Sequence, residues 1–261
     1  MIKRTLPEPT ISLPRLAILL LMSGCGIYHP PAAQAVVTTC ALPPDQSTTV
    51  SGKWAVTPIP VSFSAGQFNS TETTAITSAA DTWNQFFTTS KKIATLSYGT
   101  TANPTTSPAI NPSQAGTLCA NPILIGSQYN GTIVIYKLEK WPTSYPKSAI
   151  ALTTNCFSQT SPLNSIYMSV IELNYQAFFS NGKRVPDLQT ILLHEFGHLH
   201  GLNHSCEFTS KTGTPNCNDP QLDPNYYAAS MFPSFSFDQN GNGQQKRTLG
   251  TNDESRANCL Y

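Results

Sequence analysis

Charged residues are scarce in this sequence. Lysine, arginine, aspartate and glutamate make up 11% of its 261 residues, against roughly 25% in an average soluble protein. The 15 basic and 14 acidic residues leave a formal net charge of +1, so the chain lacks the basic excess that favours binding to nucleic acids. Serine, threonine, asparagine, glutamine and proline supply the polar positions instead, a composition that indicates an exported protein.

Long hydrophobic runs are lacking near the N-terminus. The apolar run at residues 16–22 has seven members, whereas a membrane-spanning helix needs about 20. The basic residues Lys3, Arg4 and Arg15 precede this run, and the small residues Ser23 and Gly24 follow it. A basic start, a short apolar core and small residues form an export signal. Residues 1–24 are therefore predicted to be a signal peptide.

The end of this signal has a motif of its own. Residues 21–25 read L-M-S-G-C, which resembles a bacterial lipobox with Met where Leu is usual. The resemblance implies cleavage before Cys25, lipidation of its sulfur, and anchoring to a bacterial membrane, at the outer membrane or cell surface. Ordinary signal cleavage is the alternative. Residues 25–51 are rich in proline, alanine and threonine without periodicity and are predicted to be a tether, which leaves residues 52–261 as one domain.

Cysteine usage agrees with export. The chain has seven cysteines, and setting Cys25 aside leaves six, an even number suited to an oxidising compartment. Six cysteines allow 15 pairings, so the sequence does not fix them. The most local pair is Cys206–Cys217, which would close the loop just after His204. The other two pairs then follow by order along the chain: Cys119–Cys156 and Cys40–Cys259.

Four of the five histidines lie within residues 194–204, which read H-E-x-x-H-x-x-G-x-x-H. His194 and His198 are four residues apart, so on a helix they share one face and can bind one ion. A glycine at position 201 can take a positive φ, end the helix and turn the chain, so that His204 returns as a third imidazole. Three neutral nitrogen ligands with an open fourth position are typical of catalytic zinc. Glu195, beside the first ligand, can act on a water there.

This motif resembles that of the metzincin metalloproteases, in which the three histidines bind zinc and Glu195 is the catalytic base. The run A-S-M-F-P at residues 229–233 resembles the methionine turn of the matrixin branch. Its Met231 is expected to pack beneath the imidazoles without binding the metal. The resemblance also implies that Pro233 and Phe235 wall the pocket for the residue after the scissile bond. The C-terminal run R-T-L-G-T-N-D-E-S-R-A-N-C-L-Y is similar to the acidic helix and Leu-Tyr ending of matrixin catalytic domains.

Sequence periodicity predicts an α+β fold. Residues 54–63 end in strand-like alternation, and Asn69 with Glu72 forms a capping box before apolar residues at helical spacing. Further strands are expected at 93–98, 132–138, 148–154 and 165–174, and the zinc helix should begin with Asp187 as its N-cap. The resemblance implies a metzincin-like twisted mixed sheet with a backing helix and an active-site helix, followed by a Met-turn subdomain and a C-terminal helix. It also implies that residues 148–154 are the edge strand that binds substrate.

The resemblance implies an endopeptidase with a catalytic zinc ion, Glu195 as general base and a protein or peptide substrate. The protein is expected to be a monomer. Two alternatives remain: a surface lipoprotein that uses the fold to bind a partner, with a structural or vestigial zinc site, and a nonproteolytic zinc amidase. Glu195 favours the peptidase, because a binding module does not need that carboxylate. The one histidine outside the motif, His29, lies in the predicted tether, so a second zinc is not expected.

Two other sequence features near the motif are weaker indications of function. Asp238 begins a D-x-N-x-N-G run like that of a calcium loop, but position twelve is Leu249 instead of a bidentate glutamate. A polar turn is therefore favoured over a Ca²⁺ site. His200 lies off the ligand spacing and is predicted to be packed or solvent-facing.

Overall fold

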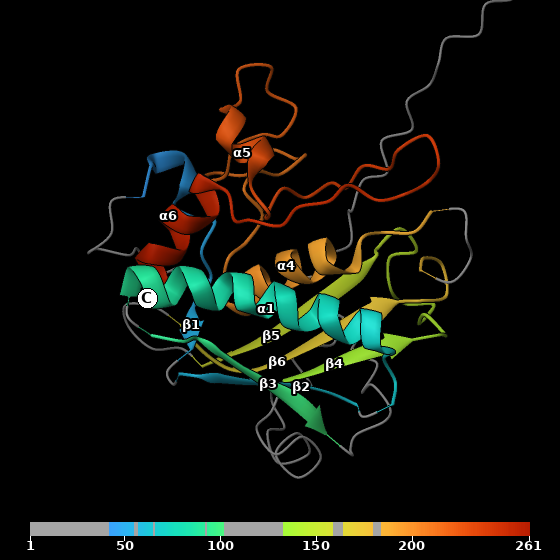
Figure 1. Ribbon diagram of the computed structural model, residues 1–261. Coiled ribbons are helices and arrows are strands. Elements are labelled where there is room, and N and C mark those ends of the chain that lie inside the picture. The colour runs from blue at the N-terminus through green and yellow to red at the C-terminus, as the bar shows by residue number, and fades with distance from the viewer. Residues whose placement is uncertain are drawn as a thin grey trace, which may run out of the picture.

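The structure, a computed structural model, describes most of the chain from Leu42 onward (Figure 1). The described residues are 42–54, 57–64, 66–91, 93–101, 133–158, 164–179 and 184–261. The predictions for the signal peptide, Cys25, Cys40 and Cys119 lie outside them.

The core of the fold is a mixed β-sheet. Its strands are β1 (Lys53–Trp54), β2 (Ile59–Ser64), β3 (Leu96–Thr101), β4 (Ile133–Leu138), β5 (Ala151–Ser158) and β6 (Ser165–Asn174). The order is β1-β6-β4-β2-β3 with parallel pairs, and β5 pairs with β6 in the antiparallel direction. Among the described strands, β5 pairs with β6 alone.

Strand boundaries differ from the predicted ones where prolines and turns intervene. The strand predicted at 54–63 is interrupted around Pro58, which has no N–H for a sheet hydrogen bond. The edge strand predicted at 148–154 begins at Ala151 and runs on to Ser158. Residues before it form turns at Pro142 and Pro146, and the strand then follows β6 along most of that strand's length.

Helix α1 (Ser70–Lys91) backs the sheet. The predicted capping box is present: Asn69 Oδ1 accepts from the Glu72 amide at 2.9 Å, and Glu72 Oε2 accepts from the Asn69 amide at 2.8 Å. One face of the helix is buried: Ile76, Ala79, Ala80, Trp83 and Phe87. The indole of Trp83 donates to the Leu193 carbonyl at 2.9 Å, which fastens α1 to the neighbouring helix α4 (Figure 1).

The second half of the chain supplies α4 (Leu188–Leu199), the short α5 (Pro224–Ala228) and the C-terminal α6 (Thr251–Leu260). Asp187 caps α4 as predicted, accepting from the Thr190 amide at 2.8 Å. Figure 1 shows α6 beside the end of α1, while α5 lies in the loop region above α4. The α+β class, with a backing helix, an inner helix and a C-terminal helix, is as predicted.

The predicted tether extends too far along the chain. Residues 44–51, named here the N-terminal strap, are packed against the loop that follows α4. The Asn203 amide donates to the Thr49 carbonyl at 2.8 Å, and the Ser51 amide donates to the Gly201 carbonyl at 2.8 Å. The strap bonds to the loop after α4, to the disulfide loop and to α6, and of its side chains Val50 joins the hydrophobic core. Because hydrogen bonds make most of these contacts, the strap has no hydrophobic periodicity.

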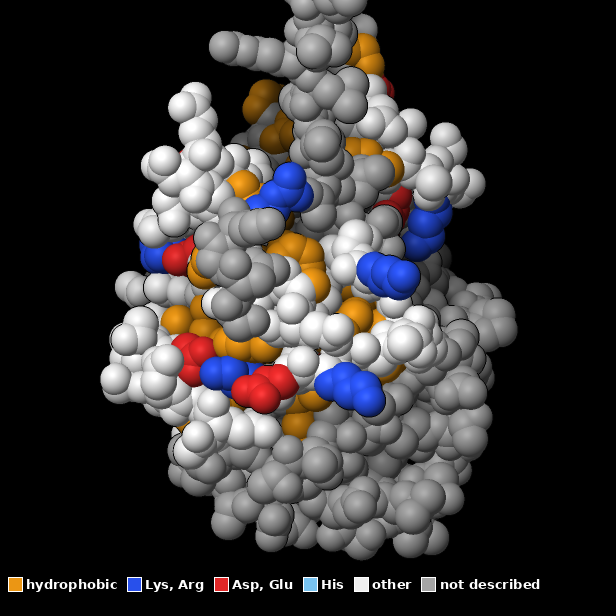
Figure 2. Space-filling model, turned by 90° about the vertical axis from the view of Figure 1, so that its right-hand side faces the viewer, with side chains coloured by type: hydrophobic (Ala, Val, Ile, Leu, Met, Phe, Trp, Pro, Cys, Tyr) orange, Lys and Arg blue, Asp and Glu red, His pale blue; other side chains and the backbone are white. Residues whose placement is uncertain are grey.

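The surface agrees with the low net charge. On the face in Figure 2, acidic and basic side chains are interspersed and do not gather into a patch of one sign. Among the described residues, no helix combines the length and hydrophobicity needed to cross a membrane.

Candidate metal centre

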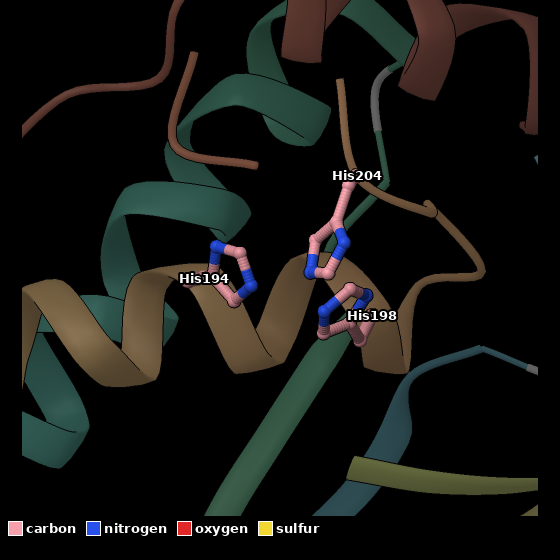
Figure 3. Close-up of side chains that lie close together, drawn as sticks. All are labelled: His194, His198 and His204. Carbon is pink, nitrogen blue, oxygen red and sulfur yellow. The ribbon is translucent and has the colours of Figure 1, made fainter. Parts of the chain in front are cut away.

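Three histidines converge above the C-terminal half of α4 (Figure 3). His194 and His198 lie one turn apart on α4, and their ring centroids are 4.6 Å apart. His204 comes back from the following loop, with its ring centroid 5.4 Å from that of His194 and 5.0 Å from that of His198. One potential ligand atom of each residue lies within 4.8 Å of the others.

The chain turns back toward the helix at Gly201, and two features require glycine at this position. Its φ is +94°, a conformation that side-chain-bearing residues rarely adopt. A Cβ at this position would also lie 1.8 Å from the Gly52 carbonyl oxygen. Gly52, the residue just after the strap, therefore approaches the turn so closely that only glycine fits at position 201.

The ring orientation of the two helical histidines is fixed by main-chain oxygens. His194 Nδ1 lies 2.7 Å from the Ser230 carbonyl oxygen, and His198 Nδ1 lies 2.8 Å from that of Leu202. A carbonyl only accepts, so each Nδ1 carries the proton in the neutral ring. Each Nε2 is then the ring nitrogen that can bind a metal.

His204 is oriented by a carboxylate. Its Nδ1 donates to Glu207 Oε1 at 3.3 Å. Its Nε2 is buried and has no hydrogen-bond partner among the described residues. A buried nitrogen in that state is costly unless a ligand engages it. The donor set therefore fits a zinc ion bound by three neutral imidazoles.

Burial also keeps the first ligand neutral. Desolvation by burial is the largest cause that lowers the pKa of His194, to about 3. An imidazole that is unprotonated at neutral pH binds a metal without first losing a proton.

The methionine turn lies directly under this helix. Met231 is fully buried, and a Cβ on Gly197 would lie 2.1 Å from its sulfur. The amides of Ser230 and Met231 donate to the carboxylate of Asp253 on α6, at 2.5 and 3.2 Å. Gly197 is a residue that the sequence analysis missed. Its position inside the predicted zinc helix could have indicated it, because glycine within a helix costs about 1 kcal/mol and needs a packing reason.

Glu195 is buried on the same helix. Its Oε2 accepts a hydrogen bond from the hydroxyl of Thr153, on β5, at 2.6 Å. Two residues further along β5, Asn155 Nδ2 donates to the His198 carbonyl at 2.7 Å. Neither contact is predicted from the sequence, because Thr153 and Asn155 lie about 40 positions before the helix residues that they contact.

The matrixin family model matches residues 54–211, which is 158 of the 261 residues and contains all three histidines and Glu195. The chain belongs to the matrixin family. No curated protein matches it. The family match and the three-histidine cluster together support a zinc metallopeptidase.

Within the described part of this matrixin, the three histidines are the one group of at least three His, Cys, Asp or Glu side chains arranged to hold a metal. The suggested Ca²⁺ loop is a polar turn: Asp238 Oδ1 accepts from the amides of Asn240 and Asn242, both at 2.8 Å, and Oδ2 accepts from Asn242 Nδ2 at 3.0 Å.

His200 is a packed residue of this matrixin. Its ring lies 4.8 Å from that of Trp83 and 5.1 Å from that of Phe87, centroid to centroid. Nδ1 donates to the Phe196 carbonyl at 2.6 Å, and Nε2 lies 2.9 Å from Thr95 Oγ1. Burial lowers the pKa of His200 to about 4. It is therefore a neutral structural histidine, the first of its two predicted environments.

The disulfide Cys206–Cys217 is present as predicted, with an S–S distance of 2.03 Å. It closes the loop that carries Glu207. Cys156 and Cys259 are also disulfide-bonded. Their predicted partners lie outside the described residues, so those two pairings remain predictions.

A small cavity of about 10 Å³ lies beside His194. Phe235 lines it, as do Ser234 and Lys246, whereas Pro233 is not among its lining residues. Phe235 thus lies at a cavity that His194 also lines, and the role of Pro233 and Phe235 as a substrate-pocket wall stays a prediction.

Proposed function

We propose that this matrixin is a zinc-dependent endopeptidase in which Glu195 is the general base. One observation carries the proposal: a buried carboxylate lies on the helix of two metal-binding histidines without belonging to the ligand cluster. A structural zinc site has no use for such a group. Burying a carboxylate is costly, so its presence there favours a chemical role.

When bound, zinc supplies a Lewis acid that polarises the peptide carbonyl and lowers the pKa of water to about 7. Glu195 accepts a proton from the attacking water as the new C–O bond forms. The same carboxyl then gives that proton to the departing amine nitrogen as the C–N bond breaks. The main-chain contacts of His194 and His198 keep both rings in one orientation throughout.

For the substrate, we propose main-chain pairing along β5, on the side away from β6. Two features support this: within the described residues β5 pairs with β6 alone, and its Thr153 and Asn155 bind α4. An extended peptide added to a sheet edge gains main-chain hydrogen bonds whatever its side chains. Phe235 is proposed to contact the residue after the scissile bond.

The test is cleavage of a randomised peptide library by the zinc-loaded protein, with and without a chelator. Glu195→Gln should retain zinc and lower kcat by roughly 10²–10⁴-fold, the usual contribution of a general base. Glu139→Gln, at an exposed carboxylate, is the matched control and should cleave like the wild type. Zinc-loaded wild-type protein that cleaves no peptide would favour the binding-module alternative, and cleavage undiminished by Glu195→Gln would place the base elsewhere.

The proposed setting is a bacterial membrane, with the mature chain lipid-anchored through Cys25. The basic start, the short apolar run and the S-G-C sequence support this location.

A further inference from the structure

The hydroxyl of Thr153 makes a close contact with the carboxylate of the proposed general base. Its distance to Glu195 Oε2 is 2.6 Å, within the range of strong O–H···O⁻ hydrogen bonds. The Glu195 main-chain oxygen is further away, at 3.4 Å. Both side chains are buried. Since the hydroxyl has a single proton, the shorter contact is the one it satisfies, and it donates to the carboxylate.

The position of Thr153 on β5 indicates that this contact has a more specific role than packing the strand against α4. Side chains two residues apart share a face of a strand, so Thr153 and Asn155 both face α4. Asn155 binds the helix main chain at His198, which fixes where the helix lies. Thr153 binds the functional group itself, which fixes where the carboxylate points.

We propose that Thr153 is a positioning residue for Glu195, holding its carboxylate in the orientation needed for proton transfer. This inference rests on the proposed function. A glutamate side chain has three rotatable bonds, and a base displaced by about 1 Å can lose roughly 100-fold in rate. The donor comes from the strand proposed to bind the substrate, so one element positions both the peptide and the base.

Thr153→Val is the main test, because valine has nearly the shape of threonine but no donor. Measured on zinc-loaded protein, kcat should fall roughly 10- to 100-fold, while KM and zinc content stay within about twofold of wild type. Thr153→Ser restores the hydroxyl and should recover most of the lost turnover. Thr77→Val makes the same change on α1, away from β5, where the hydroxyl donates to the carbonyls of Thr73 and Thr74, at 3.2 and 3.1 Å. It should leave kcat unchanged.

A double-mutant cycle decides whether the effect passes through Glu195. Added to Glu195→Gln, Thr153→Val should lower the residual rate by less than about twofold, because no base remains to be positioned. An equal loss in both backgrounds, a kcat unchanged by Thr153→Val, or a loss explained by missing zinc would overturn the inference. If Thr153→Val does not fold, Thr153→Ala replaces it, and wild-type turnover in that variant has the same meaning. Failure of the wild-type protein to cleave peptides would instead reject the proposed function.

Discussion

Asp187 fixes the first turn of the metal-binding helix by two kinds of contact. Its side chain accepts from the Thr190 amide, and both of its oxygens accept from the Arg247 guanidinium, at 2.6 and 2.7 Å. Burial raises the pKa of Asp187, but the hydrogen bonds from Arg247 and Thr190 outweigh it and hold that pKa below its usual value. The ion pair therefore stabilises the folded state only while this carboxyl is ionised.

Asp187→Asn keeps the cap and removes the charge. The free energy of unfolding at pH 7 should fall by about 1 kcal/mol, the upper range for a partly exposed ion pair. Because the folded pKa lies below the unfolded one, the wild type loses this contribution as the pH drops below about 4 toward the folded pKa. The difference in the free energy of unfolding between wild type and variant should therefore disappear at low pH. Urea unfolding at several pH values measures it, with Asp219→Asn at an exposed turn as the charge-matched control. A difference that persists at low pH would contradict the ion-pair explanation.

The site residues that could be predicted from sequence are those whose geometry is local. The spacing of His194 and His198 is a property of one helix, and the Asp187 cap is a property of its first turn. Thr153 could not be predicted, because it contacts a residue 42 positions away and lies in an ordinary strand sequence. The strap was misinterpreted for the same physical reason, since its hydrogen bonds reach residues about 150 positions further along the chain.

At the scale of elements, the third ligand is held differently from the other two. His194 and His198 are fixed by α4 itself, whereas His204 lies on a loop fixed from outside. Arg256 of α6, fully buried, donates to the Asn203 carbonyl at 2.7 Å and to the Thr49 carbonyl of the strap at 3.2 Å. The disulfide loop is tied to the strap as well, and it supplies the carboxylate that orients the His204 ring. The strap, α6 and the disulfide loop thus all hold the loop that carries His204.

Cys206→Ser combined with Cys217→Ser should therefore loosen zinc binding as well as lower stability. The chain-entropy model gives a disulfide of this loop size a worth of roughly 3 kcal/mol, less any native strain. Zinc affinity should fall by roughly 10-fold, the lower range for losing a partner that orients a ligand. Competition with a chromophoric chelator measures the affinity, and urea unfolding of the metal-free protein measures the stability.

The two readouts separate the two parts of this prediction. A variant with lower stability but wild-type zinc affinity would show that the disulfide does not act on His204. In that case the strap and Arg256 alone would be sufficient to hold the loop.

At the scale of the whole molecule, the packing of the strap shortens the segment that can separate the domain from its proposed lipid anchor at Cys25. With residues 44–51 packed on the domain, at most the 18 residues 26–43 can separate Cys25 from the packed chain. A chain of that length spans at most about 60 Å when fully extended. The metal centre of an anchored molecule is thereby confined to a layer near the membrane, which favours substrates on the same surface.

This confinement depends on Cys25 being the first residue of the mature protein and carrying lipid. One acyl chain binds a membrane only marginally, so a stable anchor needs the several chains of a bacterial lipoprotein. We expect mass spectrometry of protein produced in a bacterium that processes lipoproteins to find an N-terminal peptide that begins at an acylated Cys25. The Cys25→Ser variant, which lacks the sulfur, should incorporate no fatty-acid label, while Cys206→Ser, changed at a cysteine of the folded domain, should be labelled like the wild type. An unmodified N-terminus beyond Cys25 in the wild type would exclude the anchor and, with it, the restriction to surface substrates.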